Sequence, residues 1–394
     1  MSTKKTVLLV PGFMADTYDS EEWFVELCNK TYNDIQFVWL VPDVSYLFKY
    51  KRFWHPDSFK VLKEPVYVTH LRENNTPYLV RNIRKYNFIA NFMLFRSLFK
   101  DHQIDAVYTH FGFERIWATL FGKLWGKVTI WSEHWHSLGR RFASAKRLFY
   151  HLFVDYFIAG SHFIADTLPK GAKVFIVPSC LRLESKHGRL EENQRLLLKK
   201  KLGLPLSSTI ILMVANFTKQ KRHALALEIC EKVIEKRKDV VFVFPSDGPE
   251  RERIVRKIDE LNLNAHFILP GYVAKIDEYY QAADICMFTG FNDAAPLVVL
   301  EAMKYSLPQV AFASGGPAEV IKDGETGFLA RENDVNRFSQ RLLELIDDKT
   351  RRLLMGEKAL EVMRENYSLD TWRQRIMTVL SKILCEKSDM RKWR

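Results

Sequence analysis

A chain of 394 residues is too long for one ordinary hydrophobic core, which predicts two domains. Its composition, 47% apolar and 27% charged with 17 Gly and 14 Pro, is that of a globular protein and excludes a low-complexity or fixed-period repeat chain. The net charge of +12 favours a polyanionic partner or surface.

The five cysteines, at positions 28, 180, 230, 286 and 385, are scattered and lack CxxC spacing. They favour reduced thiols in a cytosolic protein over a disulfide framework or a zinc site. Only four consecutive apolar residues follow the N-terminal lysines, whereas a secretory signal needs about 7–15. No uncharged run approaches the roughly 18 residues that span a bilayer. We therefore expect a cytoplasmic protein whose membrane contact, if any, is peripheral.

The first half of the chain alternates short apolar runs that end in turn residues with longer amphipathic stretches. The runs are TVLLVPG at 6–12, and then IQFVWLVPD, DAVYTHFG, VTIWSEH, YFIAG and KVFIVPS. Because they lack strict alternation and are separated by helical spacers, they predict a parallel sheet covered on both faces. We expect this first α/β domain to span residues 1–185.

Basic and aromatic side chains are concentrated in three segments of this domain, at 46–54, 86–100 and 139–153. From Ser45 to Lys100 there are eleven Lys/Arg and three acids, so this stretch carries +8 of the total +12. Such a mixture suits the headgroup level of an anionic bilayer, which we favour. An ordinary domain face with core aromatics would give a similar pattern, and nucleic acid is the least favoured partner.

A polar, charged stretch that ends in KLGLP predicts a linker over 186–203. The apolar runs then resume as STIILMVAN, VVFVFPSDG, AHFILPGY, ICMFTG and PQVAFAS, which predicts a second doubly wound α/β domain over 204–367. Ser368 suits the N-cap of a final helix, and we expect the segment 368–394 to pack back on the first domain. Ligands of open α/β sheets bind beyond the carboxyl ends of the strands, so two such domains predict a cleft between them.

The stretch DAAPLVVLEAM, Asp293 to Met303, combines an apolar helix with two carboxylates. Pro296 suits the first helical position, and Ala295 before it cannot cap the free N–H groups, so the helix N-terminus is open to an anion such as phosphate. Glu301 would suit ribose hydroxyls, and Asp293 could accept from other hydroxyls of the same ligand. Equally, Asp293 could cap a turn while Glu301 faces water.

Two other loops carry chemically useful side chains. ANFTKQKRH places Lys219, Lys221 and Arg222 where a helix should start, which suits a diphosphate, although a plain basic surface loop is commoner. WSEHWH places His134 and His136 after a predicted strand, where either a catalytic or a structural role would fit. These imidazoles have no other clustered ligands, so no metal site is expected.

These segments resemble the retaining glycosyltransferases of family 4, the group 1 glycosyl transferases, whose GT-B fold has two Rossmann-like domains facing across a cleft. The strongest likeness is DAAPLVVLEAMKYSLPQVAFASGGPAEVIKDGETGFL: an acid, seven residues and a Glu, then paired glycines and a DGxxG turn. Ordered matches in ANFTKQK, SDGPE, HFILPGYV and YYQAADICMFTG extend it over nearly all of the second domain. The first domain is similar more loosely, through VLLVPG, DAVYTH, the His after TIWSE and FIAGSHFIAD.

The resemblance implies a catalytic set of three residues. Glu301 would bind the ribose of a nucleotide-sugar donor, and Asp293 would bind hydroxyls of the transferred sugar. His134 would lie near the reacting sugar.

The resemblance also implies a donor-binding set. Its members are Gly12, Asn216, Lys221, Tyr272, Val273, Ala295, Pro296, Leu297, Val298 and Glu301. Within this set Lys221 would neutralise the diphosphate, Tyr272 and Val273 would flank the base, and the backbone of 295–298 would contact phosphate or sugar. Gly12 would let the first loop approach the donor.

Four positions depart from the family pattern. Asp293 stands where the family has a Glu, and Asn216 where it has an Arg, so Lys219 or Arg222 would have to compensate. The first loop has a single glycine, and Ser179-Cys180 replaces an Asn-Gly turn.

The function that the resemblance implies is that of a retaining, hexosyl-type glycosyltransferase that needs neither cofactor nor metal. It would move a sugar from a nucleotide-diphosphate donor to a saccharide or lipid-linked saccharide in surface polysaccharide or glycolipid assembly. The basic, aromatic first domain favours a lipid-linked acceptor at the inner face of a membrane. The alternatives are a soluble or nucleic-acid acceptor, and a non-catalytic nucleotide-sugar-binding homologue.

Overall fold

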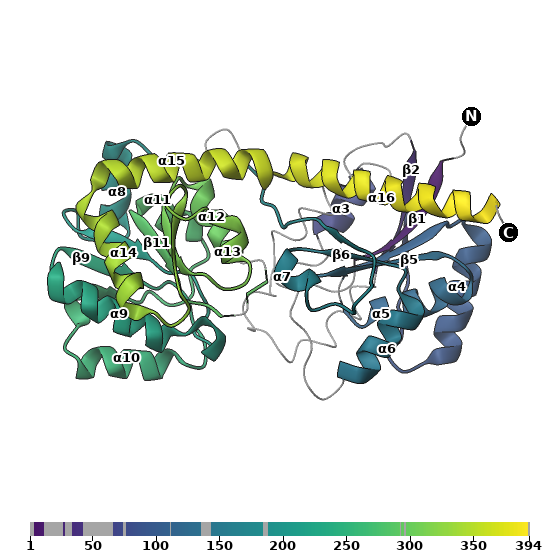
Figure 1. Cartoon of the computed structure of the whole chain (residues 1–394), viewed down its shortest axis with the longest axis horizontal. Helices are drawn as coiled ribbons and strands as arrows, with labels where there is room; N and C mark the ends of the chain where they lie inside the picture. Colours follow the sequence, from purple (N-terminus) through teal and green to yellow (C-terminus); the bar gives the residue numbers. More distant parts are fainter. Residues whose placement is uncertain are drawn as a thin grey trace. The chain divides into compact units, whose positions relative to one another are not determined.

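The structure of the chain, a computed structural model, describes residues 4–11, 27, 34–41, 66–73, 76–110, 112–134, 143–183, 188–291, 293–294 and 297–392. The described residues form two compact units (Figure 1). The first unit runs to Pro178 and takes up the chain again from Leu369, and the second comprises Ser179–Ser368. Each unit is built on its own parallel sheet.

The first unit contains a seven-stranded parallel sheet in the order β3-β2-β1-β4-β5-β6-β7. Its strands are β1 Lys5–Val10, β2 Ile35–Val41, β3 Tyr78–Val80, β4 Ala106–Thr109, β5 Val128–Glu133, β6 Tyr156–Ala159 and β7 Val174–Ile176. The described helices are α3 Val66–Glu73, α4 Phe88–Asp101, α5 Glu114–Leu124, α6 Ala143–Phe153, α7 His162–Ala165 and α16 Leu369–Lys392. The strand order reverses between β1 and β4, and such a reversal is where open α/β sheets bind ligands.

Buried aromatic rings hold α4 and α5 together over this sheet. The rings of Phe95 and Phe121 are fully buried and have centroids 5.4 Å apart. The Trp125 ring lies 5.1 Å from Phe92 and 5.8 Å from Phe99. Part of the aromatic segment 86–100 is therefore core, as the alternative interpretation of that segment predicts.

The second unit contains a six-stranded parallel sheet in the order β10-β9-β8-β11-β12-β13. Its strands are β8 Thr209–Leu212, β9 Val240–Val243, β10 Phe267–Ile268, β11 Ile285–Phe288, β12 Gln309–Phe312 and β13 Gly327–Ala330. Its helices are α8 Glu192–Lys201, η3 Lys219–Lys221, α9 His223–Lys236, α10 Arg251–Glu260, η4 Asn264–His266, α11 Ile276–Ala282, α12 Leu297–Lys304, α13 Pro317–Val320, α14 Val335–Asp347 and α15 Lys349–Asn366. The predicted pair of doubly wound domains is confirmed.

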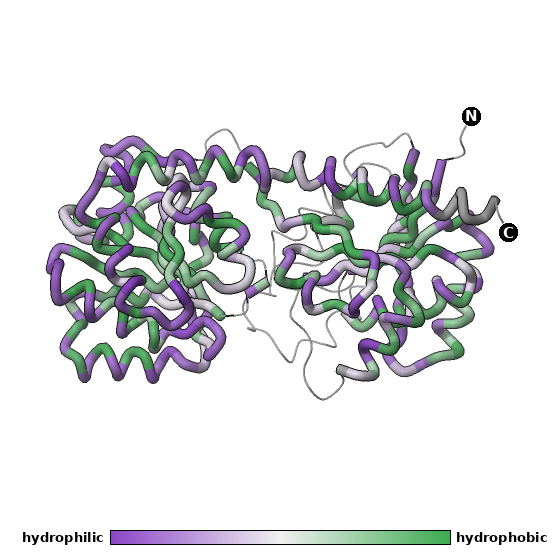
Figure 2. The backbone as a smooth tube through the Cα atoms, viewed as in Figure 1, coloured by the Kyte–Doolittle hydropathy of each residue, from purple (hydrophilic) through white to green (hydrophobic). Residues whose placement is uncertain are grey.

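Both faces of the second sheet are covered, which explains why its strands read as continuous apolar runs. Alternate residues of a strand point to opposite faces. Ile211 packs in one core with side chains of α9 and α14, whereas Ile210 and Leu212 pack in another with Tyr280 of α11. Figure 2 shows the hydrophobic residues concentrated along the strands of each unit and mixed with hydrophilic ones along the helices.

The linker predicted over 186–203 instead contains helix α8, which is part of the second unit. Two of its cations are buried and reach the carboxylate of Asp284, just before β11. Arg195 Nη2 lies 2.7 Å from Oδ1, and Lys199 Nζ lies 3.3 Å from Oδ2. The stretch looks like a linker in sequence because the charges that fix it in the domain are those that usually mark a solvated segment.

The final helix, α16, belongs to the first unit. The hydroxyl of Tyr156 in β6 donates to Glu386 at 2.9 Å. The ammonium group of Lys382 lies 5.5 Å from the centre of the Phe175 ring in β7. The helix is thus held along the β6–β7 side of its sheet.

Replacing Asp284 by Ala should lower the free energy of unfolding by about 3–5 kcal/mol, because two buried cations lose their counter-charge. Burial raises the pKa of Asp284, but Arg195 and Lys199 outweigh that effect and hold the pKa well below its usual value. The carboxylate therefore stabilises the fold above its unfolded pKa of about 3.9, and this stabilisation is lost as the pH falls below that value. Urea unfolding at pH 7 and at about pH 3 measures both effects.

The matched control is Asp239→Ala, which removes a surface carboxylate paired with Arg237 at 2.7 Å. Its cost should stay below about 1 kcal/mol. The role given to Asp284 would be contradicted if Asp284→Ala lowered the free energy of unfolding as little as the control does. It would also be contradicted if the difference in this free energy between Asp284→Ala and wild type were as large at about pH 3 as at pH 7.

Candidate active site

The loop after β8 supplies the first predicted site residues. Asn216 is exposed at its start, and its Oδ1 accepts a hydrogen bond from the Ser246 hydroxyl at 2.9 Å. Lys221 ends the short helix η3, and its ammonium group forms an ion pair with the carboxylate of Asp293. The same ammonium lies 5.2 Å from the centre of the Phe288 ring. The structure therefore brings together two of the predicted residues that are 72 positions apart.

A glycine turn after β12 lets the loop of Asp293 approach. The N–H of Gly316 donates to the carbonyl of Asp293 at 2.8 Å. Gly315 has φ +63°, and a Cβ there would lie only 2.5 Å from the same carbonyl oxygen. Because any larger residue would collide with this backbone, Gly315 of the turn ASGGPAE is needed to seat Asp293.

Glu301 lies on the half-exposed face of α12. Its Oε2 accepts a hydrogen bond of 2.5 Å from the hydroxyl of Tyr280, and the Tyr280 ring stacks on Tyr305 at 5.6 Å. Val298, one turn earlier on the helix, lies on the same face. Glu301 is thus anchored by Tyr280, contrary to the alternative in which it only faces water.

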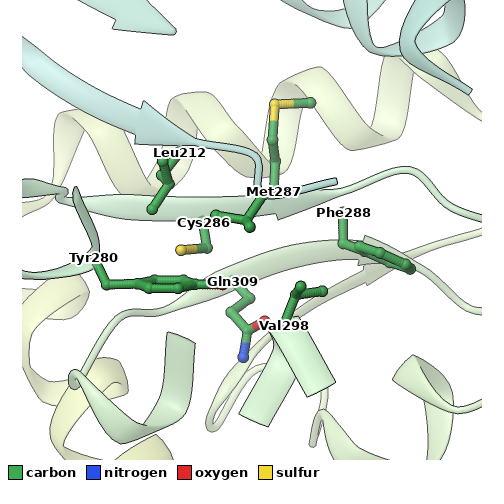
Figure 3. Close-up of a pocket in the computed structure, with 8 residues that line it drawn as sticks. Leu212, Tyr280, Cys286, Met287, Phe288, Val298 and Gln309 are labelled. Carbon is green, nitrogen blue, oxygen red and sulfur yellow. The ribbon is translucent and has the colours of Figure 1, made fainter. Parts of the chain in front are cut away.

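A small cavity of about 10 Å³, room for one water molecule at most, lies between α11, α12 and the strands β8, β11 and β12. Figure 3 shows its wall, with Cys286, Val298 and Gln309 between the rings of Tyr280 and Phe288 in that view. The residues that line it are Leu212, Val214, Tyr280, Cys286, Met287, Phe288, Val298 and Gln309. Glu301 does not line this cavity, but the hydroxyl of Tyr280, which does, donates to its carboxylate.

For the remaining predicted donor-binding residues the structure gives a degree of exposure or no description. Tyr272, on the loop after β10, is 70% exposed, whereas Val273 beside it packs against the core. Leu297 begins α12 and is half-buried. Gly12, Ala295 and Pro296, as well as His136, lie outside the described residues.

In the first unit, His134 directly follows β5 and meets a second histidine. Its Nε2 lies 3.2 Å from Nε2 of His110 and 2.8 Å from the hydroxyl of Ser132. His110 directly follows β4, the strand that pairs with β5 in parallel register. The sequence showed this residue at the end of DAVYTH, but only the pairing of the two strands gives it a role.

Both histidines are neutral near pH 7. Burial lowers the pKa of His134 to about 4. Burial also lowers the pKa of His110 well below its usual value, and the nearby His134 and Arg115 lower it further. A hydrogen bond between two neutral imidazoles needs a proton on one Nε2 and a lone pair on the other, so each fixes the tautomer of its neighbour.

A buried carboxylate, Glu133, fixes the end of β5 from which His134 projects. It accepts hydrogen bonds from Tyr150 at 2.5 Å and Trp131 at 3.1 Å. Arg115 and Lys146 lie 3.7 and 3.6 Å away. Burial raises the pKa of Glu133, but these cations and hydrogen bonds outweigh it, and the pKa falls below its usual value. The acid is therefore charged and joins α5 and α6 to β5.

The sequence pattern marked Arg222 as a basic side chain but gave no sign of its unusual backbone conformation. It has φ +58° and ψ +43°, a left-handed conformation, at the start of α9. Its guanidinium contacts Glu332 and Asn333 in the turn before α14, and it lies 5.5 Å from the centre of the Phe291 ring. Arg222 therefore holds the end of the Lys221 loop, and its charge is engaged by this turn.

No group of three or more His, Cys, Asp or Glu side chains that could hold a metal ion occurs within the part of the chain that the structure describes. The expected independence of metal stays a prediction.

Known proteins resemble this chain in sequence and in fold. Residues 194–362 match the family model of glycosyl transferases group 1. The chain is 28% identical over 170 residues to N-acetyl-alpha-D-glucosaminyl L-malate synthase of Bacillus anthracis, covering 43% of this chain and 44% of that protein. It is 26% identical over 159 residues to poly(ribitol-phosphate) alpha-N-acetylglucosaminyltransferase of Staphylococcus aureus, covering 40% and 32%. The chain thus spans less than half the length of these two curated relatives.

A solved structure matches over a longer stretch. HepE of Anabaena in complex with UDP covers 96% of this chain and 100% of its own, with a TM-score of 0.74 and 14% identity. At this level of identity the likeness concerns the fold, and it confirms the predicted GT-B type.

The His134 imidazole should stay neutral down to about pH 4, because burial disfavours its charged form. Histidine ring resonances of the folded, isotope-labelled protein, assigned with His134→Gln, report its titration. The urea-unfolded chain is the control and should titrate near 6.5. A folded-state midpoint at or above 6.5 would show that the pair accepts a proton at neutral pH.

Arg222→Gly should be more stable than Arg222→Ala by about 1 kcal/mol, because only glycine adopts the left-handed conformation without strain. Both variants lose the same side-chain contacts, so their difference isolates the backbone. Urea unfolding measures it. In the control pair at Glu228, an exposed position inside α9, alanine should be the more stable by about 1 kcal/mol. If the alanine variant were the more stable one at both positions, the backbone strain at Arg222 would be refuted.

Proposed function

We propose that the chain is a retaining glycosyltransferase, because residues 194–362 match the family model of glycosyl transferases group 1. Its donor would be a nucleotide-diphosphate sugar, and its acceptor a saccharide or lipid-linked saccharide. The observation that carries the proposal is the ion pair of Lys221 with Asp293 beyond the adjacent strands β8 and β11, together with Glu301 on the half-exposed face of α12. These are groups for a diphosphate, a sugar and a ribose.

The departing diphosphate needs a cation when the bond to the sugar breaks, and Lys221 supplies it. Asp293 holds this ammonium group in the ligand-free chain. A bound diphosphate competes with Asp293 for Lys221, and the released carboxylate can then accept hydroxyls of the transferred sugar. The shorter acid at 293 therefore has a role in both states.

Retention of configuration requires the acceptor hydroxyl to attack from the face that the diphosphate vacates. In this proposal the acceptor oxygen bonds to the anomeric carbon as the bond to the diphosphate breaks, so no protein nucleophile is needed. A phosphate oxygen of the leaving diphosphate takes the hydroxyl proton, so no protein base is needed. His134, neutral and fixed by His110, can hydrogen-bond a sugar hydroxyl without adding positive charge beside the oxocarbenium-like ring.

The acceptor class is inferred from the first unit, which is basic and aromatic. The printed names of the two curated relatives give different acceptors, L-malate and poly(ribitol-phosphate). None of the helices in the described part of the chain is both long enough and apolar enough to cross a membrane. We place the chain at the cytoplasmic face of a membrane, acting on a lipid-linked saccharide in polysaccharide or glycolipid assembly.

Two substitutions test the site. Glu301→Gln should weaken donor binding about 10–100-fold, because hydrogen bonds from ribose hydroxyls to a charged acceptor are lost. Lys221→Ala should lower turnover about 100-fold or more, because the leaving diphosphate loses its cation. Slow donor hydrolysis with a panel of UDP- and GDP-sugars, together with calorimetric binding of the nucleotides, measures both effects and identifies the base.

The matched control is Glu278→Gln on α11, a carboxylate paired with Lys201 at 2.6 Å on the surface. It should leave donor turnover unchanged. Unchanged turnover in Glu301→Gln would refute the assignment. Nucleotide binding without turnover in the wild-type chain, with any donor and acceptor tried, would identify a non-catalytic homologue instead.

A further inference from the structure

We propose that the outer faces of α4, α5 and α6 form a docking surface that binds the first unit to an anionic lipid bilayer. We name it the α4–α6 face. The inference extends the proposed function, since it names the surface that would bring the chain to a lipid-linked acceptor.

Exposed apolar side chains form one stripe along the start of α4. Tyr86, Ile89 and Met93 are 87%, 75% and 55% exposed. Ile89 and Met93, four residues apart, lie on one side of the helix, and Tyr86 stands just before its N-cap, Asn87. The opposite side is the core side, where Phe95 and Leu98 are buried. The helix is therefore apolar on two sides, and only one of them is used in folding.

The same pattern continues on the two helices beside α4. The helix α5 packs against both α4 and α6 (Figure 1). Ile116 and Leu124 of α5 are 47% and 61% exposed, and Leu148 and Leu152 of α6 are 59% and 50% exposed. Each of these pairs is spaced by four or eight residues, which is one face of a helix. Exposed apolar groups on three adjacent helices are unusual on a surface that meets only water.

Positive charge surrounds these apolar groups. The exposed cations are Arg81, Arg84, Lys85, Arg96, Lys100 and Arg147. Within 78–101, 112–124 and 144–153, Asp101 is the single exposed acid, and it accepts a hydrogen bond from Ser97 at 2.7 Å. Cations whose aliphatic stems lie on apolar groups are typical of side chains at the headgroup level of an anionic bilayer.

Hydrogen bonds fix the backbone just before Tyr86, the most exposed of these side chains. The buried side chain of Asn91 accepts from the N–H of Arg84 at 2.8 Å and donates to its carbonyl at 2.7 Å. The Trp117 indole donates to the carbonyl of Lys85 at 3.2 Å. Tyr86 follows directly, so the fold presents this ring outward from a fixed turn.

The side-chain types favour a bilayer over other anionic partners. Aliphatic Ile, Met and Leu give little stacking to nucleic-acid bases, which bind on aromatic platforms. They gain by entering the acyl boundary of a membrane, while the Lys and Arg residues around them pair with lipid phosphates.

Vesicle sedimentation of the full chain tests the proposal. Vesicles of phosphatidylcholine with about 30% phosphatidylglycerol should bind it more tightly than pure phosphatidylcholine, and added salt should weaken the binding. Ile89→Ser with Met93→Ser should lower the partition coefficient at least about tenfold, because two apolar groups leave the acyl boundary. Arg84→Gln with Lys85→Gln should lower it about 25-fold, at about fivefold for each charge.

Two control variants lie on the second unit. Leu197→Ser removes a leucine that is 70% exposed on α8, and Lys236→Gln with Lys238→Gln removes two exposed cations. Both should leave the partition coefficient unchanged. Equal losses in these controls, or equal binding to neutral and anionic vesicles, would overturn the proposal. So would self-association that is lost in the α4 variants while vesicle binding is absent, since the face would then serve a second copy.

Donor hydrolysis distinguishes this proposal from the proposed function. The α4 variants should hydrolyse donor at the wild-type rate, because none of these residues belongs to the candidate active site. Vesicle binding without donor turnover would support the docking surface and overturn the proposed function. Donor turnover without vesicle binding would support the proposed function and overturn the docking surface.

Discussion

The pairing of β8 with β11 is the constraint on which the second unit and its site depend. A carboxylate closes this pair at each end. Asp284, before β11, is buried among Arg195 and Lys199 and accepts from the N–H of Ile210 at the start of β8. Asp293, after β11, pairs with Lys221 after β8. The ion pairs of Asp284 are shielded from water and fix the strands. The Lys221–Asp293 pair is partly exposed, so a competing anion can displace Asp293 from Lys221.

In the first unit, two adjacent parallel strands are again followed by side chains that contact each other, but these are imidazoles and not an ion pair. There the adjacent strands are β4 and β5, and the groups that follow them are His110 and His134. Burial keeps both imidazoles neutral, so their contact is a hydrogen bond with a defined tautomer. The permanent charge nearby belongs to Glu133, which is bound by Arg115, Lys146 and two hydrogen bonds. In both units a buried acid provides rigidity: Glu133 directly precedes His134, whereas Asp284 lies at the opposite end of β11 from Asp293.

The basic and aromatic segment 86–100 shows why composition leaves two interpretations open. Phe95 and Phe99 are core residues, whereas Tyr86 and Ile89 are exposed, although all four lie in the same short stretch. The helical period separates them, and contact with α5 decides which side is buried. The core interpretation is confirmed for Phe95 and Phe99, and the membrane interpretation stays a prediction for the exposed residues.

The sequence by itself determined the two parallel sheets, because continuous apolar runs between amphipathic stretches fit strands that are covered on both faces. It also determined which residue types stand after the strands, including His134, Lys221, Asp293 and Glu301. Only the tertiary structure decided their partners, since strand order sets which loops are neighbours and local spacing carries no record of it. For the same reason the supposed linker became α8, because a charge whose partner lies 89 residues away looks solvated in sequence and is buried in the fold.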